Sequence, residues 1–142
     1  MQPAVAAPEF PQAPGNAIPE EILARWSWGP FFLWLFWVWW NADQKLKIAA
    51  AVIFVCEFIP FINFLAGFAA LGLAIYLGLK GNRIMAANRQ FTSAEQFVAV
   101  QTAWAKWGVI VLIVSVALII LSMVLFGAAM MAAGMHSASY SR

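Results

Sequence analysis

The feature that most constrains this chain is the run from residue 108 to residue 126, in which Ser115 and Ser122 are the only polar side chains. A helix rises about 1.5 Å per residue. These 19 residues therefore match the hydrocarbon core of a bilayer, which is about 30 Å thick. Small residues and methionines continue the run to about residue 130. The run predicts a membrane-embedded helix over residues 108–130.

The composition indicates the same class of protein. The 142 residues are 64% hydrophobic and 10% charged, whereas soluble domains are about half apolar and about a quarter charged. Eight basic and six acidic side chains cannot cover the surface of a soluble domain, so apolar surface must face lipid or other membrane proteins. We therefore expect an all-α integral membrane protein, with one membrane domain over residues 20–135.

A second apolar run, residues 48–79, contains 32 residues and is too long for one straight crossing. Pro60 has no amide donor and disfavours helix at the preceding residue. A turn near residues 59–63 would divide the run into segments 47–59 and 61–79. One long kinked helix remains the alternative.

A dense aromatic stretch precedes these two segments. Residues 26–40 hold nine aromatic side chains, and Trp concentrates where the bilayer meets water because its ring is apolar while its N–H needs a polar partner. The stretch predicts a segment at residues 28–40 that either spans the membrane or lies in the interface. The expected number of membrane-embedded segments is therefore four.

Residues 80–107 are polar and carry four of the eight basic residues, so the positive-inside rule favours a cytoplasmic location. Their first half can extend the preceding helix. Residues 92–93 and 95–96 form two overlapping capping boxes, which predict the start of a new helix. We expect an amphipathic elbow on the membrane surface. The residues expected at the level of the lipid head groups are Trp26, Trp28, Lys80, Arg83, Arg89, Trp104, Lys106 and Trp107.

Both ends of the chain are expected to be tails, Pro/Ala-rich at the N-terminus and polar at the C-terminus. Residues 1–19 contain five of the seven prolines, which is typical of an extended, disordered segment, and residues 136–142 form a short polar tail. Four segments with the N-terminus outside place six basic residues inside and two outside, whereas three segments with the N-terminus inside give five and three. The positive-inside rule favours four segments, and the side of the N-terminus stays open.

Small residues recur along two of the predicted helices. One seam has a spacing of four residues and the other a spacing of seven, and small residues let helices approach closely in lipid. The interpretation we favour is that the two seams pack against each other within one chain; the alternative is a seam for a partner chain. The seams are Ala66, Ala70, Ala74 and Gly78, and Gly108, Ser115 and Ser122.

The inventory of reactive side chains is small. Glu57 and Asn63 are polar residues within an apolar run, and we favour interface anchoring of Glu57 over an ion or proton role. His136 and Cys56 are the only residues of their types, which excludes a Cys/His zinc cluster within one chain. We expect no catalytic, cofactor-binding or metal-binding residues. The basic residues are too few and too interspersed for a nucleic-acid partner.

Three stretches together resemble a known family. They are residues 26–31 (WSWGPF), residues 77–82 (LGLKGN) followed by Asn88-Arg89, and residues 97–101 (FVAVQ) followed by Trp104 and Trp107-Gly108. The combination is similar to a family of small bacterial inner-membrane proteins of uncharacterised function, with a WNWG-type aromatic stretch and a GxKGN stretch. The resemblance implies a membrane location and several helices, and it implies no reaction. This chain has Ser27 where the family pattern favours Asn.

These observations together predict a multi-pass protein of the bacterial inner membrane that acts as a structural or accessory component of a membrane assembly. Its expected partners are the lipid bilayer and other membrane protein subunits or a second copy of itself. The alternative is a small transporter or channel component. Its pathway would have to use Glu57, Asn63, Ser115 and Ser122. An enzyme ranks third, because acids, bases and nucleophiles are scarce within the apolar segments.

Overall fold

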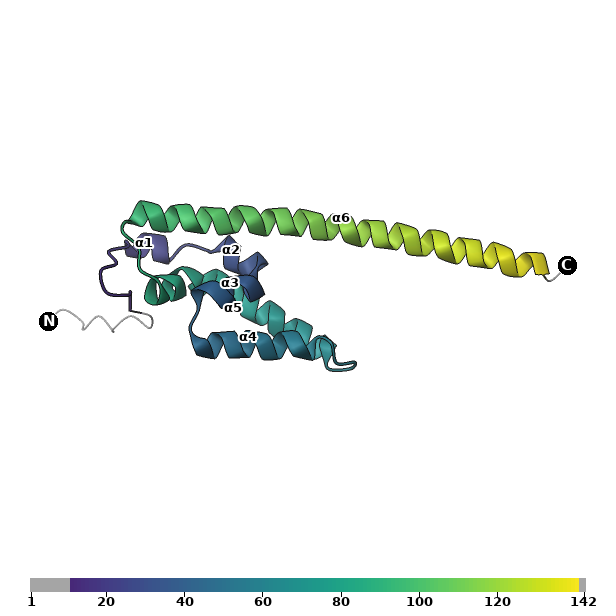
Figure 1. The fold of residues 1–142 in the computed structure, drawn as a ribbon, viewed down its shortest axis with the longest axis horizontal. Coiled ribbons are helices and arrows are strands. Elements are labelled where there is room, and N and C mark those ends of the chain that lie inside the picture. Colours follow the sequence, from purple (N-terminus) through teal and green to yellow (C-terminus); the bar gives the residue numbers. More distant parts are fainter. Residues whose placement is uncertain (1–10, 141–142) are drawn as a thin grey trace. The chain divides into compact units, whose positions relative to one another are not determined.

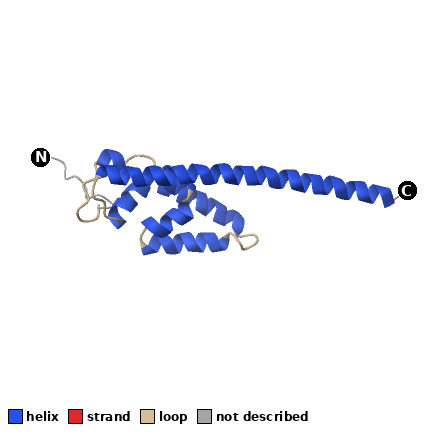
Figure 2. Ribbon diagram, turned by 45° about the horizontal axis from the view of Figure 1, so that its top comes forward, coloured by secondary structure: helices blue, strands red, loops and turns tan. Residues whose placement is uncertain are grey.

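The computed structural model describes residues 11–140, with side chains described as far as residue 133. This part of the chain forms six helices and no strand, which confirms the all-α prediction (Figures 1 and 2). The chain divides into two compact units, Met1–Gly108 and Val109–Arg142. The helices are α1 (Glu20–Leu23), α2 (Trp28–Phe32), α3 (Trp34–Asn41), α4 (Gln44–Cys56), α5 (Asn63–Asn88) and α6 (Ala94–Tyr140).

Two of these helices, α5 and α6, are long and apolar enough to cross a membrane. The other two predicted segments are shorter. Helix α3 has 8 residues and α4 has 13 residues, which correspond to about 12 Å and about 20 Å at the helical rise. The predicted segment 28–40 is divided because Leu33 leaves the helical region of φ and ψ and separates α2 from α3. By length and composition, two of the four predicted segments are able to span a bilayer, and the other two are not.

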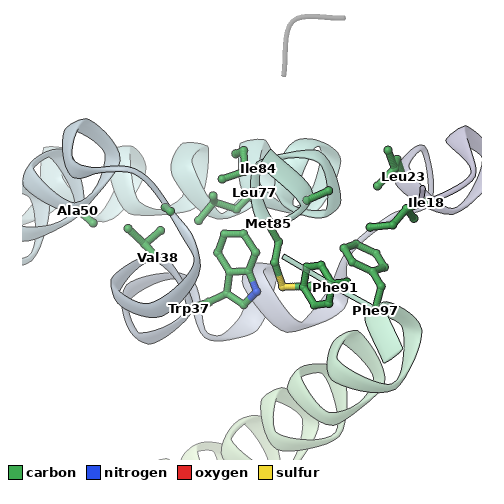
Figure 3. Close-up of a cluster of buried hydrophobic side chains, with 12 residues drawn as sticks. Ile18, Leu23, Trp37, Val38, Ala50, Leu77, Ile84, Met85, Phe91 and Phe97 are labelled. Carbon is green, nitrogen blue, oxygen red and sulfur yellow. The ribbon is translucent and has the colours of Figure 1, made fainter. Parts of the chain in front are cut away.

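The first unit has its core around the C-terminal half of α5. Leu77 and Met85 of α5, Trp37 of α3 and Phe97 of α6 are completely buried there (Figure 3). The elbow predicted for residues 80–107 contributes to this core from its first half, where Asn82, Ile84 and Met85 are buried; its position on a membrane surface stays a prediction. Its secondary structure follows the prediction, since α5 continues to Asn88 and α6 begins at Ala94.

Side chains cap the turn between α5 and α6. The Ser93 hydroxyl accepts a hydrogen bond from the Gln96 amide at 3.2 Å, and the Gln96 side-chain oxygen accepts from the Thr92 amide at 2.8 Å. These bonds satisfy amides that have no helical partner at the start of α6. The predicted capping residues therefore begin the helix as expected.

The turn between α4 and α5 has an unusual conformation. Phe61 has a positive φ of 70° and is 94% exposed within the chain. Pro60 lies within this turn, so the predicted break near residues 59–63 is present, and segments 47–59 and 61–79 correspond to α4 and the first part of α5.

The residues that precede α1 are held against α5. The Ala13 amide donates to the Ala86 carbonyl at 2.8 Å, and Asn16 hydrogen-bonds to the same region. Residues 11–19 therefore do not form the disordered tail that the proline content predicted; residues 1–10 lie outside the described residues. Of the predicted polar tail 136–142, the first five residues continue α6 and the last two lie outside the described residues.

The second unit consists of the remainder of α6. Every described side chain of residues 109–133 is exposed, and the large ones are apolar on all sides of the helix. A helix of this kind is typical of contact with lipid or with other apolar helices.

Candidate functional site

The three stretches that carry the family resemblance meet in the first unit. Glycines make this possible, because a Cβ atom at three positions would collide with an atom of another segment, and a Cβ atom at a fourth would be tightly packed. A Cβ at Gly78 would lie 2.4 Å from Cζ2 of Trp26, and one at Gly29 would lie 2.5 Å from Cβ of Trp104. We call this region, residues 26–32, 78–82 and 101–108, the junction.

Two further glycines complete the junction. A Cβ at Gly81 would lie 2.7 Å from Cγ of Pro30, and one at Gly108 would lie 3.0 Å from Cβ of Phe32. Gly78, Gly81 and Gly108 thus give the aromatic stretch flat surfaces to pack on, and Gly29 lets that stretch approach Trp104 of α6. Close packing of this kind leaves no room for an extra methyl group without a shift of the neighbours.

A chain of hydrogen bonds links the same three stretches. The Ser27 amide donates to the Gly78 carbonyl at 2.8 Å, and the Ser27 hydroxyl donates to Oε1 of Gln101 at 3.3 Å. Gln101 in turn donates from Nε2 to Oδ1 of Asn82. Ser27 and Asn82 are buried, so these bonds satisfy polar groups that would otherwise destabilise the fold by about 1–3 kcal/mol each.

Asn82 also holds the end of α1. Its Nδ2 donates to the Ile22 carbonyl at 3.2 Å and to the Arg25 carbonyl at 2.9 Å. Carbonyls at a helix C-terminus have no partner within the helix. One side chain of α5 therefore joins the end of α1 to α6, and through Gln101 it is linked to the aromatic stretch.

A hollow of about 170 Å³ lies beside this network and is lined by residues that include Arg25, Trp28 and Gln101. The polar groups of the network are two amides and one hydroxyl. A serine nucleophile needs a base within hydrogen-bond reach, and the side chain that the Ser27 hydroxyl contacts is the neutral amide of Gln101. The chemistry of the junction is thus suited to holding segments together. Among the described residues, no group of three or more His, Cys, Asp or Glu could hold a metal ion.

A second set of polar contacts ties the N-terminal segment to the turn between α5 and α6. Nδ2 of Asn16 donates to the carbonyls of Ala86 and Arg89, both at 2.8 Å. Its Oδ1 accepts from the Phe91 amide, also at 2.8 Å. Nη1 of Arg89 donates to Oδ1 of Asn41 at 2.9 Å. Residues near positions 16, 41 and 89 therefore lie together.

The first small-residue seam is buried: Ala66 is 4%, Ala70 is 8% and Ala74 is 5% exposed. We expected the two seams to pack against each other. The glycines of the two seams do not meet: Gly78 packs against Trp26, and Gly108 packs against Phe32. The two serines of the second seam are exposed, and the Ser122 hydroxyl donates to the Leu118 carbonyl.

The predicted head-group residues fall into two sets. Trp26 and Trp104 are half-buried and pack on glycines in the junction, and their position at the level of the head groups stays a prediction. The indole N–H of Trp26 is buried without a hydrogen-bond partner among the described residues. Arg83 forms an ion pair with Glu20, and Lys80 is half-buried. The exposed members of the set are Trp28, Arg89, Lys106 and Trp107.

The two predicted intramembrane polar residues flank the α4–α5 turn. Glu57 is half-buried at the C-cap of α4, and Asn63 is exposed at the first position of α5. Sequence reasoning did not identify the roles of Asn16, Asn41, Asn82 and Gln101. Two signals were present: Pro14-Gly15-Asn16 is a turn-forming sequence, and Asn82 and Gln101 belong to the stretches of the family resemblance.

Comparisons with known proteins found no matching family, no similar curated protein and no similar solved structure.

Proposed function

We propose that this chain is an integral protein of the bacterial inner membrane that acts, without catalysis, as a structural or accessory component of a membrane assembly. The observation that carries the proposal is the surface of residues 109–133 of α6. Those 25 residues are exposed on every side and contain only two polar side chains, Ser115 and Ser122. Water would not tolerate this surface, whereas lipid and apolar helices favour it.

The α4–α5 hairpin supports the same location. Large apolar side chains cover its outer surface and its turn, where a loop in water would carry Gly, Asn, Asp or Ser. The amides of Phe58, Ile59, Ile62 and Asn63 all donate to carbonyls within the turn or the helix end. Internal hydrogen bonding suits a non-aqueous environment, in which an unpaired amide is costly.

Hydrogen bonds within the first unit also bear on which side of the membrane each segment occupies. The bonds of Asn82 to the Arg25 carbonyl and of Arg89 to Asn41 and Asn16 require these residues to share one side. Residues 28–40 then enter and leave the membrane on the same side. In the four-segment arrangement, by contrast, they cross the membrane and the N-terminus lies outside.

The distribution of basic residues agrees with this arrangement. Lys45 lines the same hollow as Ile84 and Asn88, so the start of α4 lies level with the end of α5. Seven of the eight basic residues then lie on one side, and Arg142 alone follows α6. By the positive-inside rule the side that carries these seven residues is cytoplasmic. We propose that α6 crosses the membrane and that α3, α4 and the first half of α5 are embedded from the cytoplasmic side.

The accessory role rests on the junction. Interlocked rings and hydrogen-bonded amides fix the segments that emerge from the membrane, while apolar faces of α3, α4, α5 and α6 remain open to lipid or partner helices. A transport role receives less support, because the Ser122 hydroxyl donates its hydrogen bond to a carbonyl of its own helix.

Cysteine accessibility tests the membrane arrangement. Single cysteines at positions 25, 88 and 138 in a Cys56→Ser background should react with an impermeant maleimide as two groups, 25 and 88 from the cytoplasmic side and 138 from the other. Retention of the protein in the membrane after carbonate extraction is the accompanying measurement. Labelling of 88 and 138 from one side, or release by carbonate, would refute the location.

Purification in a gentle detergent tests the accessory role. The protein should retain a membrane protein subunit or a second copy of itself; a monomer without partners would refute the accessory role.

A further inference from the structure

An apolar groove lies on the outer side of α3 and α4. It has a volume of about 320 Å³ and is lined only by apolar atoms. The groove exists because α3 turns Trp37 and Val38 into the core while Phe36, Trp39 and Trp40 face outward. The residues that line it are Leu35, Phe36, Trp39, Trp40, Ala51, Phe54 and Val55.

A second hollow, with both polar and apolar walls, adjoins this groove at the N-terminal end of α4. It has a volume of about 290 Å³, contains Gln44 and Lys47, and shares Trp39 and Ala51 with the groove. Lys47 is half-buried, and among the described residues no carboxylate pairs with its ammonium group. The groove and the hollow together form an apolar site with a cation, Lys47, and an amide donor, Gln44, at one end.

We propose that this composite site binds one anionic phospholipid, with an acyl chain in the groove and the phosphate at Lys47 and Gln44. The proposal rests on the membrane location proposed above. Charge complementarity selects the occupant: a single unpaired ammonium group beside an amide suits a phosphate, and apolar walls suit an acyl chain. Trp39, which borders both spaces, lies where an indole ring commonly sits, at the boundary between head groups and acyl chains.

The chain contains a matched control for the charge. Lys45 is two residues from Lys47 on α4, but it lines a different hollow with Asp43 and Tyr76. Substitution of either lysine by Gln removes one positive charge from the same helix. A bound head group would respond only to Lys47, whereas a general attraction to an anionic surface would respond to both.

The groove has a matched control as well. Ala51 lines both spaces of the composite site, whereas Ala49 is exposed beside Lys45 in the other hollow. Ala51→Phe would fill the composite site, and Ala49→Phe adds the same volume elsewhere on α4. Thermal melting without added lipid establishes that each variant is folded.

The experiment is native mass spectrometry of the full chain, purified in mild detergent and titrated with phosphatidylglycerol or with phosphatidylcholine of the same acyl chains. We expect the wild type to retain one phosphatidylglycerol in preference to phosphatidylcholine. Lys47→Gln should weaken the binding of phosphatidylglycerol about fivefold, with Lys45→Gln unchanged. Ala51→Phe should weaken the binding of both lipids, and Ala49→Phe should weaken neither.

Equal losses from Lys47→Gln and Lys45→Gln would overturn the proposal, as would equal retention of the two lipids by the wild type. Full displacement of phosphatidylglycerol by millimolar inorganic phosphate would also overturn it, because the acyl chain would then contribute nothing. Carbonate extraction separates this failure from failure of the proposed function. A protein that stays in the membrane without lipid preference refutes the lipid site alone.

Discussion

Replacing Gly78 with Ala measures how tightly the junction is packed. The new Cβ would lie 2.4, 2.5 and 2.9 Å from three ring carbons of Trp26, so the ring or α5 must move by about 1 Å to restore van der Waals contact. The ring has little freedom to retreat, because Trp26 also packs against Trp28 and Phe31 with ring centroids 5.7 and 5.4 Å away. Overpacking of this kind typically destabilises a fold by about 1–3 kcal/mol.

Gly72 provides the control, since it lies in the same helix and a Cβ there would meet nothing within 4 Å. Both substitutions gain up to about 1 kcal/mol of helix propensity, so the difference between them isolates the collision with Trp26. Gly72→Ala should therefore raise the melting temperature, measured by circular dichroism in detergent. Gly78→Ala should melt about 3–10 °C below Gly72→Ala. Equal shifts would mean that Trp26 is loosely held, and the reasoning about the junction would fail.

Three further predictions concern single contacts. Asn82→Ala should lower the free energy of unfolding by about 1–3 kcal/mol, because two carbonyls at the end of α1 lose their donor; chemical denaturation measures this, and a loss below about 0.5 kcal/mol would contradict it. Asn16→Ala should accelerate hydrogen exchange at the Phe91 amide, which loses its acceptor, and unchanged exchange would count against the contact. Ala74→Leu should lower the melting temperature more than Leu73→Ala does, because Ala74 is 5% exposed while Leu73 is half-buried; a reversed order would place the seam against lipid.

Several elements could be predicted because their signals are local. The apolar run at residues 108–126 is uninterrupted, so periodicity was not needed to assign a helix. The break near Pro60 follows from a missing amide, and the start of α6 follows from capping residues adjacent in sequence. In each case the interaction that determines the structure lies within a few residues of the element.

The position of residues 28–40 could not be predicted, because nearly all of their side chains are apolar. In α3, Trp37 and Val38 face the core while Trp39 and Trp40 face outward, and a helix that is apolar on both faces carries no pattern that separates them. The sequence is therefore equally compatible with a spanning helix and with this short helix on a core.

The long-range polar contacts, in the junction and at Asn16, were hidden for a different reason. Asn16 is 75 residues from Phe91, and Ser27 is 74 residues from Gln101. A single sequence offers no signal for pairs at such separations. The small-residue seam shows the same limit: its spacing predicts a smooth surface, but only the fold reveals that Gly78 meets Trp26.

The turn at Phe61 leads to a last prediction, which concerns the environment of the α4–α5 hairpin. A left-handed conformation costs a residue with a Cβ about 1–2 kcal/mol, and Gly or Asn would avoid this cost. The ring does not recover it within the chain, because Phe61 is 94% exposed. Burial of a Phe side chain in hydrocarbon contributes about 1.5–3 kcal/mol, which is enough to offset the strain. The apolar turn is therefore expected to lie in lipid.

Spin labelling tests this expectation directly. A nitroxide attached at Phe61→Cys in the Cys56→Ser background should be relaxed more strongly by oxygen, which partitions into lipid, than by a water-soluble nickel chelate. The control is Asn88→Cys, since Asn88 is exposed at the end of α5 and should show the opposite preference. Because the Phe61 side chain is 94% exposed, its replacement should leave the fold intact, which circular dichroism checks. Strong relaxation by the nickel chelate at both positions would place the turn in water. The strain at Phe61 would then have no compensation from lipid, and the embedded hairpin would have to be abandoned.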